Sequence, residues 1–338
     1  MEFDNTEFIV CLGAGDVNAD GNADVVFAQE QAAVVIALGD GDGGFGPNLV
    51  VDALAPSTCI LRDFDLDGGL ELGARFSNVS LWSLSATGGA VLAEPTFEGT
   101  ASTQLFAAPD LNGDGTVDLI AGVRTFGGSD RVVPLISAPG LDELEASTWR
   151  PAGTELIALA VGDLNNDSYD DVAWLSAPEV GPDRIQAILG NESGKRQVFL
   201  DLLYEAPDGV ELQDIALANV SGSEALDIVF IQGSELSILP GNGLVGFAAV
   251  EQVATIGTPH RLVSAEVDGT DTPEVAVLYS DVPQLSIVDT VDGGLSVENL
   301  ALPSEGRVVE SADANDDGVD DFLVASVDGP VYLVVSDL

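Results

Sequence analysis

Seven copies of one nine-residue pattern recur along this chain, and they restrict its fold more than any other feature. In each copy an acid or amide stands at alternate positions, and a short apolar run follows. The copies are DVNADGNAD from Asp16, DFDLDGGLE from Asp63, DLNGDGTVD from Asp110, DLNNDSYDD from Asp163, NVSGSEALD from Asn219, EVDGTDTPE from Glu266 and DANDDGVDD from Asp313. They begin 47, 47, 53, 56, 47 and 47 residues apart. We call them loops 1 to 7 and number their residues as positions one to nine.

Each loop is embedded in apolar runs that have the length of strands. The runs directly after the loops are VVFA, LGAR, LIAG, VAWL, IVFI, VAVL and FLVA, each bounded by turn residues. One candidate strand precedes a loop, as in FIVCLGA, and two more follow, as in AAVVIALG and NLVVDA. Four strands in about 47 residues without helical periodicity are typical of one propeller blade. A β-solenoid fits the spacing less well, because its coils are usually shorter.

The sequence therefore predicts an all-β chain, with residues 1–338 forming a single seven-bladed β-propeller of four-stranded antiparallel blades. The last repeat stops after PVYLVVSDL and lacks a fourth strand. Alignment of loop 1 with loop 2 places Glu2 and Phe3 opposite the fourth strand of the preceding blade. We expect Met1 to Asn5 to complete blade 7, which would close the ring and remove an exposed sheet edge.

Alternating oxygen donors in a tight loop are the ligand pattern of calcium. Side chains at positions one, three, five and nine, with the carbonyl of position seven, could surround one ion, and a glycine at position six permits the turn. An EF-hand needs a glutamate at position twelve and flanking helices. The best copies carry an apolar residue there, inside a predicted strand, so the EF-hand and dockerin interpretations fit poorly: Phe27, Ala74, Ala121, Trp174 and Val324.

These loops, each followed by an apolar strand, resemble the FG-GAP and VCBS repeats of integrin α-subunit propellers and their bacterial relatives, over essentially the whole chain. In that family the loop joins the first two strands of a blade and binds calcium. The resemblance implies about five Ca²⁺ sites, in loops 1 to 4 and 7. Their ligands would be Asp16, Asn18, Asp20, Asn22, Asp24; Asp63, Asp65, Asp67, Gly69, Glu71; Asp110, Asn112, Asp114, Thr116, Asp118; Asp163, Asn165, Asp167, Tyr169, Asp171; and Asp313, Asn315, Asp317, Val319, Asp321.

Loops 5 and 6 depart from the pattern. Loop 5 has Asp227 as its only carboxylate at the ligand positions, and we expect it to bind no metal. Loop 6 keeps Glu266, Asp268 and Glu274 but has Thr270 at position five, which leaves its occupancy open. A single such loop would be read as a metal-free turn. Five copies in register favour metal, because crowded carboxylates repel one another without a cation.

The charge balance excludes several partners. The chain has 57 acidic and 10 basic residues and a net charge of −47. Nucleic acids and anionic membranes bind proteins chiefly through lysine and arginine, so neither is expected as a partner. No apolar run reaches the roughly 20 residues of a membrane helix. Five calcium ions would offset only a small part of the charge, so the rest predicts a solvated acidic surface, with a cationic partner as the alternative.

Residues that could carry chemistry are sparse, and we predict that the chain is not an enzyme. His260 is the only histidine, no nucleophile elbow lies near it, and we expect it at the start of a blade 6 strand. A glycosidase carboxylate pair stays open as the least favoured alternative. The three tryptophans, Trp82, Trp149 and Trp174, stand at unrelated repeat positions, which favours packing over a repeated sugar site.

The two cysteines precede their loops at similar places. Cys11 lies five residues before loop 1 and Cys59 four before loop 2, on equivalent inner strands. A disulfide between blades 1 and 2 is one interpretation. Two separately buried thiols are the favoured alternative.

Together these features predict a calcium-binding, extracellular, integrin-α-like propeller that binds protein ligands or mediates adhesion as a monomer, with calcium in a structural role. The alternative is a carbohydrate-binding propeller. Secretion is inferred from the low-affinity calcium pattern, since residues 1–7 contain three acids and no basic signal-peptide region. The inserts at 127–131, 139–153 and 177–183 are either recognition loops or tolerated surface variation.

Overall fold

The computed structural model describes residues 9–29, 33–40, 44–46, 48–51, 58–75, 79–85, 88–93, 100–137, 144–195, 197–223, 225–270, 272–291, 294–314, 317–327 and 331–335. All regular secondary structure in these ranges is β-strand, from β1 to β28. A helix able to cross a membrane is absent from them.

The strands pair in chain order into seven antiparallel sheets. Blades 1 to 3 contain β1 (Ile9–Gly15), β2 (Asp24–Gln29), β3 (Val34–Ala37) and β4 (Leu49–Val51); β5 (Thr58–Arg62), β6 (Glu71–Arg75), β7 (Val79–Ser85) and β8 (Gly88–Ala93); and β9 (Thr100–Ala107), β10 (Leu119–Thr125), β11 (Asp130–Ser137), β12 (Leu144–Ala146) and β13 (Arg150–Pro151). Blades 4 and 5 contain β14 (Glu155–Gly162), β15 (Asp171–Ala177), β16 (Arg184–Leu189) and β17 (Val198–Glu205); and β18 (Leu212–Ala218), β19 (Asp227–Gln232), β20 (Glu235–Leu239) and β21 (Glu251–Val253). Blades 6 and 7 contain β22 (Pro259–Ala265), β23 (Glu274–Tyr279), β24 (Gln284–Val291) and β25 (Gly294–Ala301); and β26 (Gly306–Ala312), β27 (Asp321–Ser326) and β28 (Val331–Val334).

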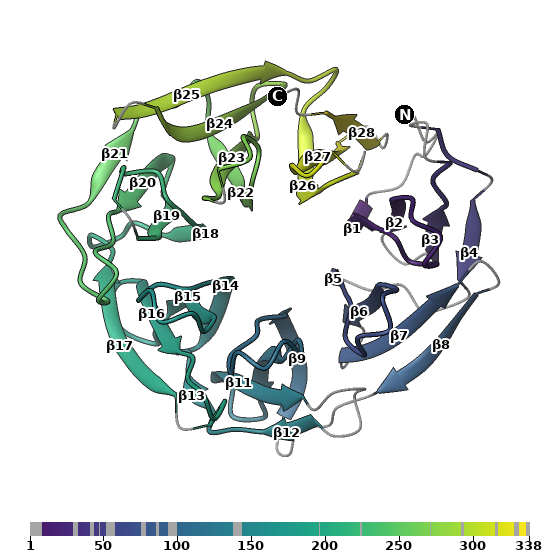
Figure 1. The fold of residues 1–338 in the computed structure, drawn as a ribbon. Coiled ribbons are helices and arrows are strands. Elements are labelled where there is room, and N and C mark those ends of the chain that lie inside the picture. Colours follow the sequence, from purple (N-terminus) through teal and green to yellow (C-terminus); the bar gives the residue numbers. More distant parts are fainter. Residues whose placement is uncertain are drawn as a thin grey trace.

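The seven sheets stand around a central axis, with the first strand of each blade innermost (Figure 1). This confirms the predicted propeller and its seven blades. Blade 3 fills its outer position with two short strands, β12 and β13, which both pair with β11. Blade 7 has three described strands, and the predicted fourth, residues 1–5, lies outside the described residues.

The hydrophobic core is divided among the junctions between blades. Seven clusters of buried residues occur in the described ranges, one between each pair of neighbouring blades. Second strands supply much of this core, and every residue of β19, β23 and β27 is buried. At the last junction Ile9 and Phe27 of blade 1 lie in one cluster with Leu323 of blade 7. This cluster joins the last blade to the first and so closes the ring. Burial of each such side chain contributes roughly 1.5–3 kcal/mol to the stability of the fold.

Covalent and polar links also join neighbouring inner strands. Cys11 on β1 and Cys59 on β5 form a disulfide, with their Cα atoms 5.2 Å apart. The expectation of two separate thiols is therefore wrong: the register of adjacent inner strands brings the two residues within disulfide range. On the other side of the ring, the Ser264 hydroxyl donates to the Leu217 carbonyl at 2.8 Å, and the Ser311 hydroxyl to the Ser264 carbonyl at 2.9 Å.

Reduction of the disulfide should lower the free energy of unfolding by about 3 kcal/mol, because the bond spans 48 residues and restricts the unfolded chain. Urea denaturation of the oxidised and reduced protein measures this difference. The double variant Cys11→Ser/Cys59→Ser is the control and should match the reduced wild type. Equal midpoints for oxidised and reduced protein would contradict the prediction.

Charged side chains on the inner strands of three blades influence one another electrostatically. Glu310 on β26 is close enough to Arg62 on β5 and Asp214 on β18 for the three charges to interact, although their blades are not adjacent. Burial raises the pKa of Glu310 to about 7; Arg62 opposes the rise and Asp214 adds to it. The folded protein therefore holds this proton more tightly than the unfolded chain does, and stability falls as the pH rises from about 5 to 8.

Glu310→Gln should accordingly stabilise the protein by about 2 kcal/mol at pH 8 and change little at pH 5, because glutamine resembles the protonated acid. Chemical denaturation at the two pH values tests this. Glu298→Gln, on the exposed face of β25, is the matched control and should show no such pH dependence. Destabilisation by Glu310→Gln at pH 8 would sink the idea.

Candidate metal centre

All seven loops lie at one end of the ring, which we call the lower face. Each loop joins the first strand of a blade to the second, and the inner strands all run in the same direction. The opposite end, where the inner strands begin, is the upper face. The position predicted for the loops, at the junction of the first two strands, is therefore confirmed.

In loops 1 to 4, 6 and 7, backbone N–H groups donate to the carboxylate at position one, and the loop curls around it. In loop 1 the Asp16 carboxylate accepts from the backbone N–H of Asp20 at 3.1 Å and of Gly21 at 2.7 Å. The same two bonds form at Asp110, Asp163 and Asp313. In loops 1 to 4 and 7, position six takes a positive φ, which glycine adopts without strain; Gly68 has φ 93° and Ser168, its counterpart in loop 4, has φ 70°.

The remaining predicted ligands of these five loops follow the same plan. The backbone N–H of position seven donates to the carboxylate of position five in every case: Asn22 to Asp20, Gly69 to Asp67, Thr116 to Asp114, Tyr169 to Asp167, and Val319 to Asp317. At position three, the Asn112 and Asn165 amides donate to the position-five carboxylates of their own loops at 3.0 Å. Asn315 lies outside the described residues.

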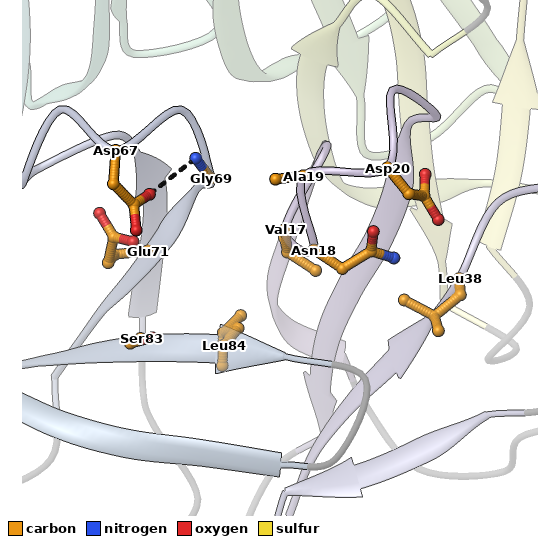
Figure 2. A pocket seen from close by; sticks show the side chains of 10 residues that line it. All are labelled: Val17, Asn18, Ala19, Asp20, Leu38, Asp67, Gly69, Glu71, Ser83 and Leu84. Atoms are coloured by element: carbon orange, nitrogen blue, oxygen red, sulfur yellow. Dashed lines mark hydrogen bonds between the residues drawn. The ribbon is translucent and has the colours of Figure 1, made fainter.

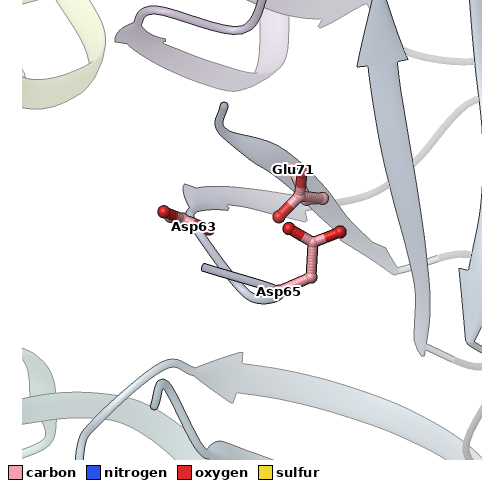
Figure 3. Close-up of side chains that lie close together, drawn as sticks. All are labelled: Asp63, Asp65 and Glu71. Atoms are coloured by element: carbon pink, nitrogen blue, oxygen red, sulfur yellow. The ribbon is translucent and has the colours of Figure 1, made fainter. Parts of the chain in front are cut away.

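Loop 2 gathers three carboxylates that could hold one cation. Atoms of Asp63, Asp65 and Glu71 lie within 4.8 Å of one another, and Figure 3 shows the Asp65 and Glu71 carboxylates turned toward each other. The Oδ1 atom of Asp63 is buried and has no hydrogen-bond partner among the described residues. An unpartnered carboxylate oxygen beside two further carboxylates is costly unless a cation is bound there. The residues present therefore fit a calcium ion.

Loop 6 has the same arrangement, although its occupancy was left open from the sequence. Glu266, Asp268 and Glu274 offer atoms within 4.8 Å of one another, and the buried Oε2 of Glu266 has no hydrogen-bond partner in the described ranges. Burial raises the pKa of Glu274 to about 7, and the neighbouring acids add to the rise. Glu71 behaves in the same way in loop 2. A bound cation would favour the ionised carboxylates and so lower their pKa values again.

Position nine is buried in all seven loops and is a hydrogen-bond acceptor in each. Its carboxylate accepts from the backbone N–H of position two, at 2.9 to 3.1 Å, at Asp24, Glu71, Asp118, Asp171, Asp227, Glu274 and Asp321. In loops 1, 3, 4 and 5 the second oxygen accepts, at 2.8 Å, from the N–H of a residue at the end of the third strand or up to two residues beyond it. Loops 2 and 6 have glutamate here, and each contributes this residue to its carboxylate group.

Three glycines make the position-nine contacts possible, and the sequence analysis missed them. Gly39, Gly190 and Gly241 donate to the position-nine aspartates of loops 1, 4 and 5. A Cβ atom on any of them would lie 2.1 to 2.4 Å from a position-eight carbonyl oxygen. Only glycine allows the third strand to approach the loop this closely. A glycine directly after the third strand, as in IALG and AILG, was the available signal.

Loop 5 is partly filled by its own side chains, although the buried Oδ1 of Asn219 has no hydrogen-bond partner among the described residues. The Ser221 hydroxyl donates to the Asp227 carboxylate at 2.9 Å, and the Asn219 amide donates to the Ser223 carbonyl at 2.6 Å. Hydrogen-bond donors thus occupy places that carboxylates take in loops 2 and 6. The absence of metal from loop 5 stays a prediction.

Neighbouring loops are bonded to one another. The carbonyl of position one accepts from the N–H of position eight in the next loop, as Leu70 to Asp16 at 3.0 Å and Asp170 to Asp110 at 3.1 Å. Asp320 donates to Glu266 in the same way. The Asp170 carboxylate also accepts from the Asp110 N–H at 2.7 Å. Sequence reasoning missed position eight, although the paired aspartates DD in loops 4 and 7 were a visible signal.

A cavity of about 460 Å³ opens on the lower face between loops 1 and 2. Asn18 and Asp20 of loop 1 lie across it from Asp67 and Glu71 of loop 2 (Figure 2). Its acidic lining belongs to these two loops, so loops 1 and 2 form one continuous oxygen-rich surface.

The packing role predicted for the tryptophans is confirmed for Trp174 and is not seen for Trp149. Trp174 is fully buried and stacks on Phe199, with ring centroids 5.8 Å apart. Trp149 is 46% exposed and lies beneath the Arg131 guanidinium, 4.0 Å from its ring centroid. His260 stands at the start of β22 in blade 6, where the sequence placed it.

Comparison with known proteins shows that solved structures share the fold of this chain. No family model and no curated protein matches this chain. The structure of BBS1N in complex with ARL6DN is similar, with a TM-score of 0.67 and 11% sequence identity over 98% of this chain and 93% of that chain. A lectin of Agrocybe aegerita, described as recognising non-reducing terminal N-acetylglucosamine, has a TM-score of 0.60 and 15% identity over 88% of this chain and 81% of that chain. The Dos1 propeller has a TM-score of 0.56 and 11% identity over 98% and 93%.

The chain is a seven-bladed β-propeller. These sequence identities are too low to carry a function from one propeller to another, because one fold hosts many activities. What this propeller does must be argued from its own loops and surfaces.

Proposed function

We propose that this propeller is an extracellular binding module, similar to the integrin α-subunit propellers, whose lower-face loops hold structural calcium. The observation that carries the proposal is the pair of buried, unpartnered carboxylate oxygens, on Asp63 and Glu266, each inside a group of three acids. Carboxylates and carbonyls are the ligands that calcium prefers. Because neighbouring loops are hydrogen-bonded to each other, an ion in one loop would also hold the next blade in place.

Two features support an extracellular location. The Cys11–Cys59 disulfide fits an oxidising compartment, where such bonds form and persist. Loops of this kind also suit surroundings in which calcium is plentiful.

The upper face supplies the proposed ligand surface. Two of the inserts noted in the sequence are turns between second and third strands on this face. Phe126, beside one insert, is 80% exposed, and Val180, within the other, is 86% exposed. Exposed apolar side chains on loops held by a rigid scaffold are typical of protein-binding surfaces. We propose that they contact a protein ligand and that the propeller acts without catalysis.

A pull-down from an extracellular protein extract tests this function. We expect the calcium-loaded propeller to retain a protein that is lost with a chelator and lost when Phe126→Ser and Val180→Ser are combined. The variant Val198→Ser, which changes an exposed side chain on the outer strand β17, is the control and should retain the ligand. Absence of any ligand that depends on both calcium and the upper-face residues would refute the proposal.

A carbohydrate ligand is the second candidate, favoured by the structural likeness to a glycan-binding lectin. Trp149 is the most exposed of the three tryptophans, and the ring face that Arg131 does not cover could stack on a sugar ring. A glycan array probed with calcium-loaded protein distinguishes the two candidates. Binding to a defined glycan that Trp149→Ala abolishes would favour this alternative over a protein ligand.

A further inference from the structure

A second cavity, also of about 460 Å³, lies on the upper face where blades 6, 7 and 1 meet. His260 and Arg261 reach it from β22, and Arg307 and Val308 from β26. Val10 of β1 and Ser280, just after β23, also line the cavity. The cavity lies at the opposite end of the inner strands from the metal loops, so it is a separate site.

A repeated backbone irregularity positions the cavity residues. In the pairing between the first and second strands, the residue six places before the loop is skipped in blades 1, 3, 4, 6 and 7: Val10, Gln104, Ile157, His260 and Arg307. A β-bulge of this kind redirects the side chain of the extra residue. His260, Arg307 and Val10 therefore hold equivalent bulge positions on three successive blades. The fold presents one side chain per blade here, and blades 6 and 7 make theirs basic.

The basic character of the cavity runs against the composition of the whole chain. The protein has ten lysines and arginines and one histidine among 338 residues, with a net charge of −47, yet three of these basic side chains line one cavity. Burial lowers the pKa of His260, and the charges of Arg261 and Arg307, which line the same cavity, lower it further. Asp214 is the acid that faces Arg261.

The Arg261 guanidinium retains donors that a ligand could use. Among the described residues its hydrogen bond is one N–H donated to the His260 carbonyl at 3.3 Å. A guanidinium carries five N–H donors in a fixed plane and binds a carboxylate through two of them. The Ser280 hydroxyl is exposed at the same cavity; it donates to the Thr258 carbonyl at the long distance of 3.5 Å and could turn to a ligand instead.

We propose that this cavity binds the carboxylate of a small organic acid, with Arg261 and Arg307 contacting the anionic group. Val10 and Val308 give the cavity an apolar side that suits the carbon body of such a ligand, which inorganic phosphate lacks. A single negative charge is also repelled less than a dianion by the acidic surface. The volume lies within the range of small-molecule sites, which is roughly 300–1,000 Å³.

His260 provides a direct readout, because it is the only histidine and its imidazole gives one set of ring-proton NMR signals. The calcium-saturated full chain is titrated with glucuronate, with N-acetyl-leucine, with neutral glucose and with inorganic phosphate. We expect at least one of the two carboxylates to shift the His260 signals to saturation while glucose does not. Saturation by glucuronate alone indicates a sugar acid as the natural ligand class, and saturation by N-acetyl-leucine alone indicates a peptide carboxyl terminus.

Arg307→Gln should weaken the carboxylate affinity about ten-fold or more, as expected for loss of a charge-assisted contact. Arg307→Lys keeps the charge without the planar fork and should give an intermediate affinity. The matched control is Arg184→Gln, at the edge of blade 4, where Arg184 pairs with Glu205 at 3.2 Å; it should bind like the wild type. If Arg307→Gln does not fold, Arg261→Gln makes the same test at an exposed side chain.

Three results would overturn the proposal. The first is that neither carboxylate shifts the His260 signals. The second is that phosphate saturates the signals while the carboxylates do not. The third is that the Arg307 and Arg184 variants bind the carboxylate equally. The titration does not use the metal loops or the protein ligand, so its failure is distinguishable from failure of the proposed calcium-dependent binding.

Discussion

Removal of calcium should lower the melting temperature of this protein by about 10 °C, and added calcium should restore it. A ligand at 100 times its Kd stabilises the folded state by about 2.7 kcal/mol per site. Loops 2 and 6 alone supply two such sites, each with a buried carboxylate oxygen that nothing else in the described residues satisfies. Without the ion, neighbouring carboxylates repel one another, which strains the loops and the hydrogen bonds between loops of adjacent blades.

Calorimetry in excess calcium and in a chelator measures this effect. Asp65→Asn removes one carboxylate from loop 2 and should reduce the calcium-dependent rise in melting temperature. Asp208→Asn makes the same chemical change at an exposed turn outside the loops and should leave that rise intact. A melting temperature that is the same with calcium and with chelator would disprove the calcium assignment.

The second large effect is expected at position nine. Asp171→Ala should lower the free energy of unfolding by about 3–5 kcal/mol, because two buried backbone donors, the N–H groups of Leu164 and Gly190, lose a charged acceptor. These donors belong to the loop and to the end of the third strand, so the carboxylate joins two hairpins of blade 4. Denaturant unfolding measures the change.

Comparison between loops separates this hydrogen-bonding role from metal binding. Asp227 accepts the same kind of bonds in loop 5, which we expect to be metal-free. Asp227→Ala should therefore cost as much as Asp171→Ala, with and without calcium. Asp167→Ala, at the exposed position five of loop 4, should matter mainly when calcium is present. A small cost for Asp171→Ala in chelator would show that its carboxylate acts chiefly as a metal ligand.

The repeat made the architecture predictable. A buried strand after every loop and a spacing near 47 residues were enough to predict seven four-stranded blades, because both features are local in the sequence. The plan of each loop was predictable for the same reason. The position-one and position-five carboxylates bond to backbone groups within five residues of themselves, and such contacts depend little on the rest of the fold.

Contacts between repeats could not be predicted in this way. The sequence allowed Cys11 and Cys59 to be bonded or separate, and only the stagger of two inner strands decided for the bond. It also ranked loop 6 below loop 2, because Thr270 replaces an acid there. The backbone nevertheless brings Glu266, Asp268 and Glu274 together without that acid.

By itself, therefore, the sequence determined the class of fold, the number of blades and the place of the oxygen-rich loops, since these follow from short-range patterns that repeat. The tertiary structure alone decided which groups meet across blades: the disulfide, the bonds between neighbouring loops, and the joining of His260 with Arg307 in one basic cavity. Those residues are 47 or more positions apart, and the distance between them is set by how the blades twist and pack around the ring.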